Sequence, residues 1–565
     1  MKIFCLRLTK SFLLSGALTI LLLFVCLFTS IKLMPLAQDD AYIHFRISEN
    51  FAKYFLPYFN VSEKVMSTSS FVWTSLLAVF AFFKLSLPIT IAILNPILIV
   101  IGSSIWPRLL SKLEENRKRS FLSYLFQIVY TGLLLPSALG LMETPLAFLL
   151  LGIGVLLISN NKPFGWIFFA LAIFTRYEIA IYIGLFGLDW LLSDRIWKQK
   201  IVGYLYLIVP TILISAVLLG FYATILPNTL YAKNEIYQIS FTNTFNKVLY
   251  SIIPQGSYPF LGIFYFLQSF QIKCFLLLSK IWQPAFYSLV GVSIASYFYK
   301  FHKRQKNNTA FILLIGGIVL AALYTLEQVL IFDWYIPIYS IPIVFGVYYY
   351  ANEIRIEYIN KKTENQKTNS YKFISIPIFL LMLILSLKPI ASIGLNLYSS
   401  SVDISQSPTA AKGMRVQRYL EVGRVLYSLY PNANLLTSEI GGLGYSFKGE
   451  IIDGVGLITP RALAYHPMKV PQQRRSGGIG AIPAALVGRE MPELVVSYPI
   501  FVEEFDSSIY RDKYTKIVVS AFSKIWQTRT GINNIWGDEE LFIYIRNDIV
   551  NEQDLDYLID TLSHS

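Results

Sequence analysis

The sequence has few of the side chains that form disulfides or bind transition metals. Its 565 residues include three cysteines and four histidines, and neither type recurs at the spacing of a zinc site or a disulfide framework. Cys5 lies near the start, and Cys26 and Cys274 lie in or beside apolar runs. The motifs HExxH, GxSxG, GxGxxG and GxxxxGK[ST] do not occur either. Hydrolysis by those routes and nucleotide binding by glycine-rich loops therefore have no support.

Charged residues are also scarce, and this scarcity sets the class of protein. They make up 15% of the chain, against 55% hydrophobic residues, and the mean hydropathy is +0.52. One soluble core cannot bury so much apolar surface, which is arranged in repeated long runs. The net charge of +13 comes from short basic clusters between these runs, as orientation signals do, and not from a nucleic-acid-binding surface. We expect an α-helical polytopic membrane protein with no nucleic-acid partner.

The apolar runs predict about eleven transmembrane helices of roughly 20 residues, some of them short. They lie near 11–33, 88–106, 121–139, 145–159, 163–175, 179–193, 201–225, 281–300, 310–326, 334–350 and 372–396. Lysine and arginine concentrate on the cytoplasmic side of a membrane, so the basic clusters orient the spans. With an odd number of spans, the N-terminus is predicted inside and everything after about 397 outside. The first run resembles a signal peptide, but no small-residue cleavage site follows it, so we expect an uncleaved span.

Two further apolar segments do not fit this count. They are 71–84 and 260–278. A re-entrant or interfacial helix is one interpretation of each, and the first can instead form one broken crossing with 88–106. Periodicity does not decide between these alternatives.

The composition changes after about Ser400, which divides the chain into a membrane domain, 1–398, and a soluble domain, 399–565. Glycine, proline and charged residues rise there, and the apolar runs shorten to strand length. Strands are predicted at 434–439, 450–453, 493–497, 516–520 and 541–546, the last after the turn signal Trp536-Gly537-Asp538. Helices are predicted at 411–429 and 481–491. This pattern predicts an extracytoplasmic α/β domain, and a structural lid without a ligand is the alternative to a functional role.

A charged stretch follows the first apolar run, at the start of a first extracytoplasmic loop of about 34–70. It reads Gln38-Asp39-Asp40-Ala41-Tyr42-Ile43-His44-Phe45-Arg46. Charge beside hydrocarbon is costly unless it has a use, so we interpret this stretch as the active site. The alternative is that Asp39 and Asp40 only cap the helix that begins there, because acids suit a helix N-terminus.

Other polar residues interrupt apolar surroundings on the same predicted side of the membrane. They are Glu143, Arg176, Glu178, Asn228 and Lys233. An interfacial ion pair is the plain explanation of Arg176 with Glu178, and snorkelling is that of Lys233. Taken together, they place carboxylates and cations at one membrane face. There a carboxylate can take a proton from a hydroxyl, while arginine and lysine hold a phosphate.

The same residues resemble a known family over most of the chain. The matching motifs are Asp39-Asp40-Ala41-Tyr42-Ile43-x-Phe45-Arg46, Phe59-Asn60-x-x-Glu63-Lys64-Val65, Ser69-Ser70-Phe71-x-Trp73-Thr74-x-Leu76, Gly140-Leu141-Met142-Glu143-Thr144, Thr175-Arg176-x-Glu178, Leu226-Pro227-Asn228-Thr229-x-Tyr231-Ala232-Lys233 and Ile452-Asp453-x-x-Gly456-Leu457-x-Thr459-Pro460. In this order they resemble the GT-C membrane glycosyltransferases related to the mycobacterial terminal β-(1→2)-arabinofuranosyltransferase. Tyr177 and Phe71 depart from the pattern, since relatives usually or often have proline there.

The resemblance implies a GT-C fold in a bacterial cytoplasmic membrane, with the active site on the extracytoplasmic face. Nucleotide sugars are not ordinarily available there, so the donor is expected to be a polyprenyl-phosphate sugar, arabinofuranose being the sugar the resemblance suggests. A cell-envelope glycan is the expected acceptor. The implied reaction is inverting: an acid deprotonates the acceptor hydroxyl, which attacks the anomeric carbon as the lipid phosphate leaves.

The resemblance gives Asp39 the role of base, because the first acid of the pair has this role in similar enzymes. Asp40 is expected to orient substrate or its partner, since adjacent residues on a helix point about 100° apart. Repulsion between the two acids raises one pKa, which suits a base. Arg46, Arg176 and Lys233 are the candidates for phosphate binding, and Glu143 and Glu178 are expected to orient these cations. His44 is expected to make a hydrogen bond, with proton transfer as the alternative. Asn228 is expected to support the site.

Two other classes of function stay open at this point. A lipid or solute transporter also needs buried charges, but it predicts internal repeats and polar residues spread through the spans. A non-catalytic glycan-binding or assembly protein on the same fold is the second alternative. No protein cofactor or metal site is predicted, although a divalent cation held by Asp39, Asp40 and a substrate phosphate is an open alternative.

Overall fold

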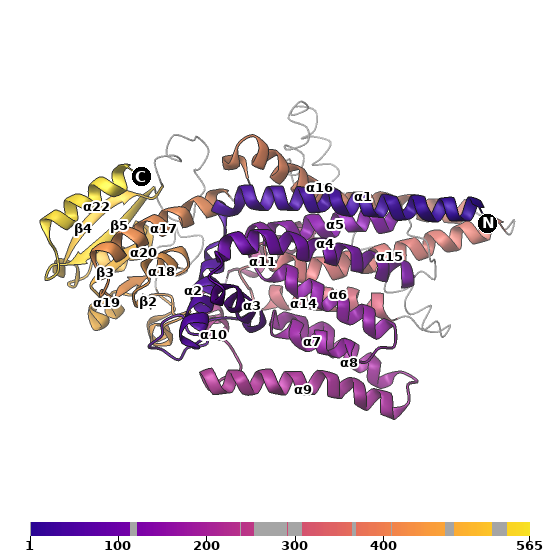
Figure 1. The fold of residues 1–565 in the computed structure, drawn as a ribbon, viewed down its shortest axis with the longest axis horizontal. Helices are drawn as coiled ribbons and strands as arrows, with labels where there is room; N and C mark the ends of the chain where they lie inside the picture. Colours follow the sequence, from indigo (N-terminus) through magenta and orange to yellow (C-terminus); the bar gives the residue numbers. More distant parts are fainter. Residues whose placement is uncertain are drawn as a thin grey trace.

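The protein forms a long helical bundle with a small α/β domain at one end (Figure 1). The computed structural model describes residues 2–113, 121–237, 239–252, 291, 308–363, 369–407, 410–468, 480–522 and 539–564. The predicted segments at 260–278 and, apart from residue 291, 281–300 lie outside these residues, as does the turn signal at 536–538.

Helices occupy every predicted run of the membrane domain that the structure describes. They are α1 (Lys2–Leu33), α4 (Leu87–Leu113), α5 (Phe121–Leu139), α6 (Thr144–Ser159), α7 (Gly165–Ile173), α8 (Ala180–Leu192), α9 (Trp197–Tyr222), α14 (Thr309–Leu326), α15 (Ile336–Thr363) and α16 (Asn369–Ser401). Among the described residues, α1, α4, α5, α9 and α14 are long and apolar enough to cross a membrane. Only 11% of the apolar window of α9 is buried, a degree of exposure that suits lipid and not water.

The segment at 71–84 forms α3 (Phe71–Phe82), which is too short at 12 residues to cross a bilayer of about 30 Å. It ends where Lys84 adopts a left-handed φ of 57°, and α4 begins three residues later. It packs on α2 (Asp39–Tyr54), the helix of the acid pair.

Helix α2 joins two hydrophobic cores, because successive apolar residues point to different sides of it. Ala41 and Phe45 belong to the core of the bundle, whereas Ile43 and Ile47 belong to the core of the C-terminal domain. Both acids lie in its first turn, where the helix dipole stabilises negative charge. Figure 1 shows α2 with α3 and α10 (Asn228–Ile236) between the bundle and the C-terminal domain.

The C-terminal domain contains one mixed sheet of five strands in the order β2-β1-β3-β5-β4. The strands are β1 (Leu435–Thr437), β2 (Ile451–Asp453), β3 (Leu494–Ser497), β4 (Tyr514–Ser520) and β5 (Glu540–Arg546). β1 runs parallel to β2 and β3, while β5 runs antiparallel to β3 and β4. The described helices around it are α17 (Ala410–Leu429), α18 (Gly442–Phe447), α19 (Ala484–Glu490), α20 (Pro499–Asp506) and α22 (Glu552–His564). The five predicted strands and both predicted helices are thus confirmed, with ends that differ by a few residues.

Both faces of this sheet are buried, since alternate residues of its strands belong to different cores. Leu435 and Val496 pack on one side with α17, and Leu436 and Val495 pack on the other side with α20.

Candidate active site

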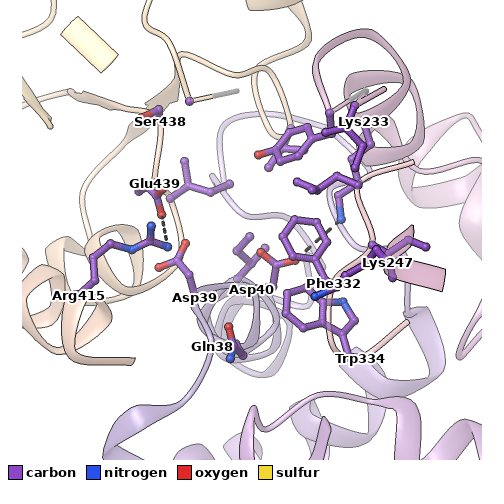
Figure 2. Close-up of a pocket in the computed structure, with 18 of the residues that line it drawn as sticks. Gln38, Asp39, Asp40, Lys233, Lys247, Phe332, Trp334, Arg415, Ser438 and Glu439 are labelled. Atoms are coloured by element: carbon purple, nitrogen blue, oxygen red, sulfur yellow. Dashed lines mark ion pairs between the residues drawn. The ribbon is translucent and has the colours of Figure 1, made fainter. Parts of the chain in front are cut away.

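A cavity of about 390 Å³ lies where the start of α2 meets the C-terminal domain and the helices α10 and α11 (Phe241–Ile252). Figure 2 shows the acid pair at its floor, Glu439 and Arg415 on one wall, and Lys233, Lys247 and aromatic rings on the opposite wall. The lining residues are Gln38, Asp39, Asp40, Ile43, Lys233, Tyr237, Ile239, Asn243, Lys247, Leu330, Ile331, Phe332, Trp334, Arg415, Ser438, Glu439, Ile440, Leu457 and Gly480. Three predicted site residues, Asp39, Asp40 and Lys233, are therefore brought together.

The carboxylate of Asp39 is held by the backbone of the C-terminal domain. Its Oδ2 accepts the N–H of Gly441 at 2.9 Å, and its Oδ1 accepts the N–H of Gly442 at 2.8 Å. A Cβ on Gly441 would come within 2.0 Å of the Asp39 carbonyl oxygen, so the close approach requires glycine. Burial raises the pKa of Asp39, against the lowering effect of the two amides and Arg415, and nearby Asp40 raises it further.

Asp40 points into the cavity and pairs loosely with Lys233. The distance from its Oδ2 to Lys233 Nζ is 3.9 Å, and both side chains are about one-third exposed, at 32% and 27%. Lys233 Nζ also donates to the hydroxyl of Tyr335 at 2.9 Å and lies 5.5 Å from the centre of the Phe332 ring. Burial lowers the pKa of Lys233, but Tyr335 and Asp40 together raise it above the usual range, so this side chain is a cation.

A second lysine on the same wall is one that the sequence interpretation missed. Lys247 Nζ lies 3.7 Å from Asp333 and is half exposed, and Asn243 lies one helical turn before it. The rings of Phe332 and Trp334 stack at 4.7 Å beside them. The only sequence signal for this site was the i, i+4 spacing of two polar residues in an amphipathic helix.

The opposite wall carries another pair that was missed. Arg415, on α17, lies 3.1 Å from the carboxylate of Glu439, which follows β1, and each side chain is 10% exposed. Burial raises the pKa of Glu439 to about 7, although Arg415 opposes this shift. A charged residue at the end of the predicted strand 434–439 was visible in the sequence, but nothing there placed it beside Asp39.

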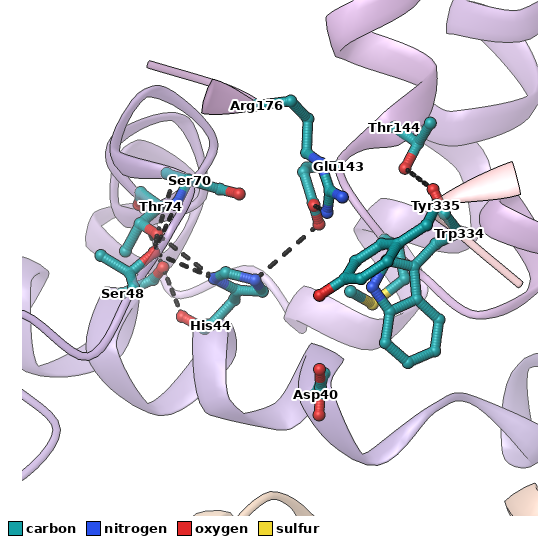
Figure 3. Close-up of polar contacts among 12 residues, drawn as sticks. Asp40, His44, Ser48, Ser70, Thr74, Glu143, Thr144, Arg176, Trp334 and Tyr335 are labelled. Carbon is teal, nitrogen blue, oxygen red and sulfur yellow. Dashed lines mark hydrogen bonds and ion pairs between the residues drawn. The ribbon is translucent and has the colours of Figure 1, made fainter. Parts of the chain in front are cut away.

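Four other predicted residues form a closed cluster behind the cavity, and none of them lines it (Figure 3). Arg176 contacts Glu143 at 2.5 Å and Glu178 at 2.8 Å, and His44 Nε2 lies 3.8 Å from the second Glu143 oxygen. The Arg176 guanidinium lies 4.7 Å from the Tyr335 ring, whose hydroxyl contacts Lys233. We call His44, Glu143, Arg176 and Glu178 the closed cluster.

Within the closed cluster the charged groups pair with one another, although Glu143 Oε2 and Arg176 Nε are buried without a hydrogen-bond partner. Arg176 is 4% exposed and Glu143 is 1% exposed, so the ion pair is shielded from water. The Nδ1 of His44 lies 3.3 Å from the Thr68 hydroxyl and 3.4 Å from that of Thr74. This geometry fits hydrogen bonding by His44, and Arg176 does not line the cavity.

The structure corrects the placement expected for Arg46. Its buried guanidinium donates to the carbonyls of Phe59 at 2.9 Å, Gly449 at 2.6 Å and Gly444, and to Asn60 Oδ1 at 3.2 Å. It also stacks 4.4 Å from the centre of the Phe59 ring. Four acceptors take four of its five N–H donors, so Arg46 ties α2 to α18, and it does not line the cavity.

Asn228 supports the edge of the cavity through the backbone. Its side-chain amide donates to the carbonyls of Gly456 at 2.6 Å and Leu457 at 2.9 Å, and Leu457 lines the cavity. Asn228 therefore fixes the loop after β2 against α10. Within the described part of the chain, no three His, Cys, Asp or Glu side chains are grouped so that they could hold a metal ion.

Comparison with known proteins gives a likeness of fold and none of sequence. No protein-family model matches the chain, and no curated protein matches its sequence. The crystal structure of ArnT from Cupriavidus metallidurans in the apo state aligns with a TM-score of 0.50 and 10% identity over 97% of this chain and all of that one. The likeness confirms the predicted fold class: a mostly helical, multi-pass membrane protein of the GT-C type with a C-terminal mixed sheet.

Proposed function

We propose that this chain is an inverting glycosyltransferase that moves a sugar from a polyprenyl-phosphate donor to a cell-envelope glycan acceptor. One observation carries the proposal: two adjacent carboxylates and two lysines face one cavity beside a bundle of apolar helices. A lipid phosphate needs cations next to an apolar path, and an acceptor hydroxyl needs a base. The GT-C fold is the fold expected for such an enzyme.

The lysine wall is the proposed site of the donor phosphate. Lys233 and Lys247 supply positive charge on the side of the cavity formed by α10 and α11, and Phe332 and Trp334 supply apolar surface beside it. An ammonium group stabilises a phosphate as negative charge builds up on it in the transition state. Arg46 and Arg176 are not part of this site, because their guanidinium groups are occupied elsewhere.

Asp39 is the proposed base. Two backbone amides fix the direction of its carboxylate, and its raised pKa brings its basicity closer to that of a working base. A hydroxyl oxygen of the acceptor forms a bond to the anomeric carbon and its proton passes to Asp39. The bond from that carbon to the phosphate oxygen breaks, and its electron pair leaves with the phosphate. Asp40 aligns Lys233 for this step through their ion pair.

The sugar and the location follow from the sequence resemblance. Arabinofuranose is the sugar proposed, and the reaction is placed on the extracytoplasmic face of a bacterial cytoplasmic membrane. The basic clusters between the apolar runs support this orientation. The cavity residues support binding of a phosphate and of hydroxyl groups. The sugar is identified by testing a panel of donors.

The test is transfer of labelled sugar from a panel of synthetic polyprenyl-phosphate sugars by the protein in nanodiscs. We expect Asp39→Asn to reduce the rate by about a hundredfold or more, the typical scale of general acid–base catalysis, while donor binding survives. Glu49→Gln is the matched control, since Glu49 lies on the same helix but pairs with Lys448 outside the cavity. Melting temperatures identify any loss from misfolding, because an asparagine carboxamide accepts from only one of the two glycine amides.

The Asp40→Asn variant separates this proposal from helix capping. Asp40 makes no hydrogen bond with a backbone N–H among the described residues, so its loss should spare the fold and reduce transfer. If both acid variants transfer as fast as the wild type, the pair has only a structural role and the proposed site is wrong. If no donor is consumed by any form, the assignment as a transferase fails.

A further inference from the structure

The segment 438–442 runs from the end of β1 to the first residue of α18, and it has two roles. Ser438, Glu439 and Ile440 line the cavity, and the amides of Gly441 and Gly442 hold Asp39. The same short segment therefore forms part of the cavity wall and holds the Asp39 carboxylate by hydrogen bonds. Any ligand that rests on this wall lies beside the Asp39 carboxylate.

The position of this segment in the sheet is one where ligands commonly bind. β1 is central among the parallel strands, with β2 on one side and β3 on the other. The chain leaves β1 toward β2 and later returns to its other side as β3, so a crevice forms at the carboxyl end of β1. Ser438 and Ser497, which end this part of the sheet, share a hydrogen bond of 3.1 Å. Glu439 lies at the mouth of that crevice.

The charge of this wall selects the kind of ligand. Glu439 and Asp39 lie together on this side of the cavity, and their carboxylates repel a phosphate, although Arg415 offsets part of this charge. The lysines that would attract one are on the opposite wall (Figure 2). A carboxylate held at 3.1 Å by Arg415 is, in contrast, a strong and oriented acceptor for the hydroxyls of a sugar.

We infer that Glu439, held by Arg415, is the hydroxyl-binding residue of the acceptor subsite, so that the C-terminal domain forms one half of the active site and is more than a lid. This inference rests on the proposed function and names the place of its second substrate. Glu439 accepts a hydrogen bond from a hydroxyl next to the attacking one, and this bond places the attacking oxygen at Asp39. Burial raises the pKa of Glu439 to about 7, and a hydroxyl donor beside the carboxylate favours its charged form.

The decisive variant is Glu439→Gln, with donor and acceptor titrated separately. We expect the acceptor KM to rise about tenfold to a hundredfold, the scale of a lost hydrogen bond to a charged group. The donor KM and the slow hydrolysis of donor by water without acceptor should change less than about twofold by the same reasoning. Glu439→Asp keeps the charge and should recover part of the acceptor affinity.

The matched control is Glu490→Gln. Glu490 is paired with Arg461 at 2.9 Å in the same domain but does not line the cavity, so its loss should leave both KM values unchanged. A rise of the donor KM equal to that of the acceptor, or an unchanged acceptor KM in Glu439→Gln, overturns the inference. Melting temperatures of all variants exclude unfolding as the cause.

Direct binding separates this inference from the proposed reaction. Short oligosaccharides of arabinofuranose, galactofuranose, glucose and mannose are titrated into the wild type and Glu439→Gln without donor. If the wild type binds one of them through Glu439 but transfers nothing, the transferase proposal fails and the sugar subsite stands. If transfer occurs and Glu439→Gln binds acceptor as the wild type does, the transferase proposal stands and the sugar subsite at Glu439 is rejected. Binding of none by the wild type, together with an acceptor KM that does not respond, rejects the subsite.

Discussion

Two groups of charged residues lie close together at this end of the bundle, and they differ in what their charges contact. In the closed cluster, Arg176 and Glu143 are 4% and 1% exposed and bind each other at 2.5 Å. In the cavity, Asp40 and Lys233 are 32% and 27% exposed and approach no closer than 3.9 Å. A buried ion pair is destabilising when one partner is removed, whereas charges held apart beside a cavity keep capacity for a substrate.

The sequence presented both groups in the same way, as polar residues in apolar surroundings on one predicted membrane face. Tyr335 separates them in space, since its ring lies against Arg176 and its hydroxyl accepts from Lys233. An isolated charge near a membrane therefore indicates a function only when it faces a cavity and its hydrogen-bonding groups are not already used. Arg46 gives the same lesson, because carbonyl groups take its donors.

The largest effect on stability is expected in the closed cluster. Arg176→Met leaves Glu143 buried without its counter-charge, which typically costs about 3–5 kcal/mol. Denaturation in detergent should show this loss for Arg176→Met and little loss for Lys233→Met, whose partner Asp40 can still be hydrated. Equal loss in the two variants would contradict the distinction between the two groups.

The next effect is expected on donor binding at the cavity. Lys233→Met removes a charged partner of the proposed phosphate, and a hydrogen bond to a charged group is worth about 1.5–3 kcal/mol. The donor KM should therefore rise about tenfold to a hundredfold. Arg195→Met is the control, since Arg195 follows the end of α8, does not line the cavity and stacks on Trp190. An unchanged donor KM in Lys233→Met would move the phosphate to another part of the cavity.

The pH dependence of transfer should report Asp39. Its carboxylate acts deprotonated, so kcat/KM falls about tenfold for each pH unit below its pKa. Facing it are Arg415, Asp40, Glu439 and the amides of Gly441 and Gly442. The cation and the amides lower its pKa, and Asp40 raises it. Arg415→Met removes a lowering influence, so the acidic limb should move to higher pH by about one unit. Arg415→Lys keeps the charge and should leave the limb near its original position; a shift to lower pH would remove Asp39 as the base.

The smallest effect is expected at the rim of the cavity. Lys247 is 47% exposed and lies 3.7 Å from Asp333, and exposed charge pairs are worth about 0.2–1 kcal/mol. Lys247→Met should raise the donor KM by about fivefold at most, and added salt should weaken the difference because it screens exposed charges. A loss as large as that of Lys233→Met would make both lysines equal ligands of the phosphate.

The helices and strands were predictable because local patterns determine them. Long apolar runs produced α4, α5 and α14, and runs of strand length after about 400 produced β1 and β3. The acid pair was also predictable, since Asp39 and Asp40 stand out at the end of an apolar run. Glu439 and Lys247 were not, because their neighbours in sequence look like those of any strand end or surface helix.

Apolar periodicity and local charge suffice to predict a multi-pass helical bundle, a C-terminal α/β domain and an acid pair at the start of a helix. They do not predict which charges share a cavity, because that depends on contacts between remote parts of the chain. The amides of Gly441 and Gly442 reach Asp39 across about 400 residues of chain, and carbonyls equally remote in sequence take the donors of Arg46. Such pairings depend on how the two domains pack, and the spacing of residues along the chain does not encode them.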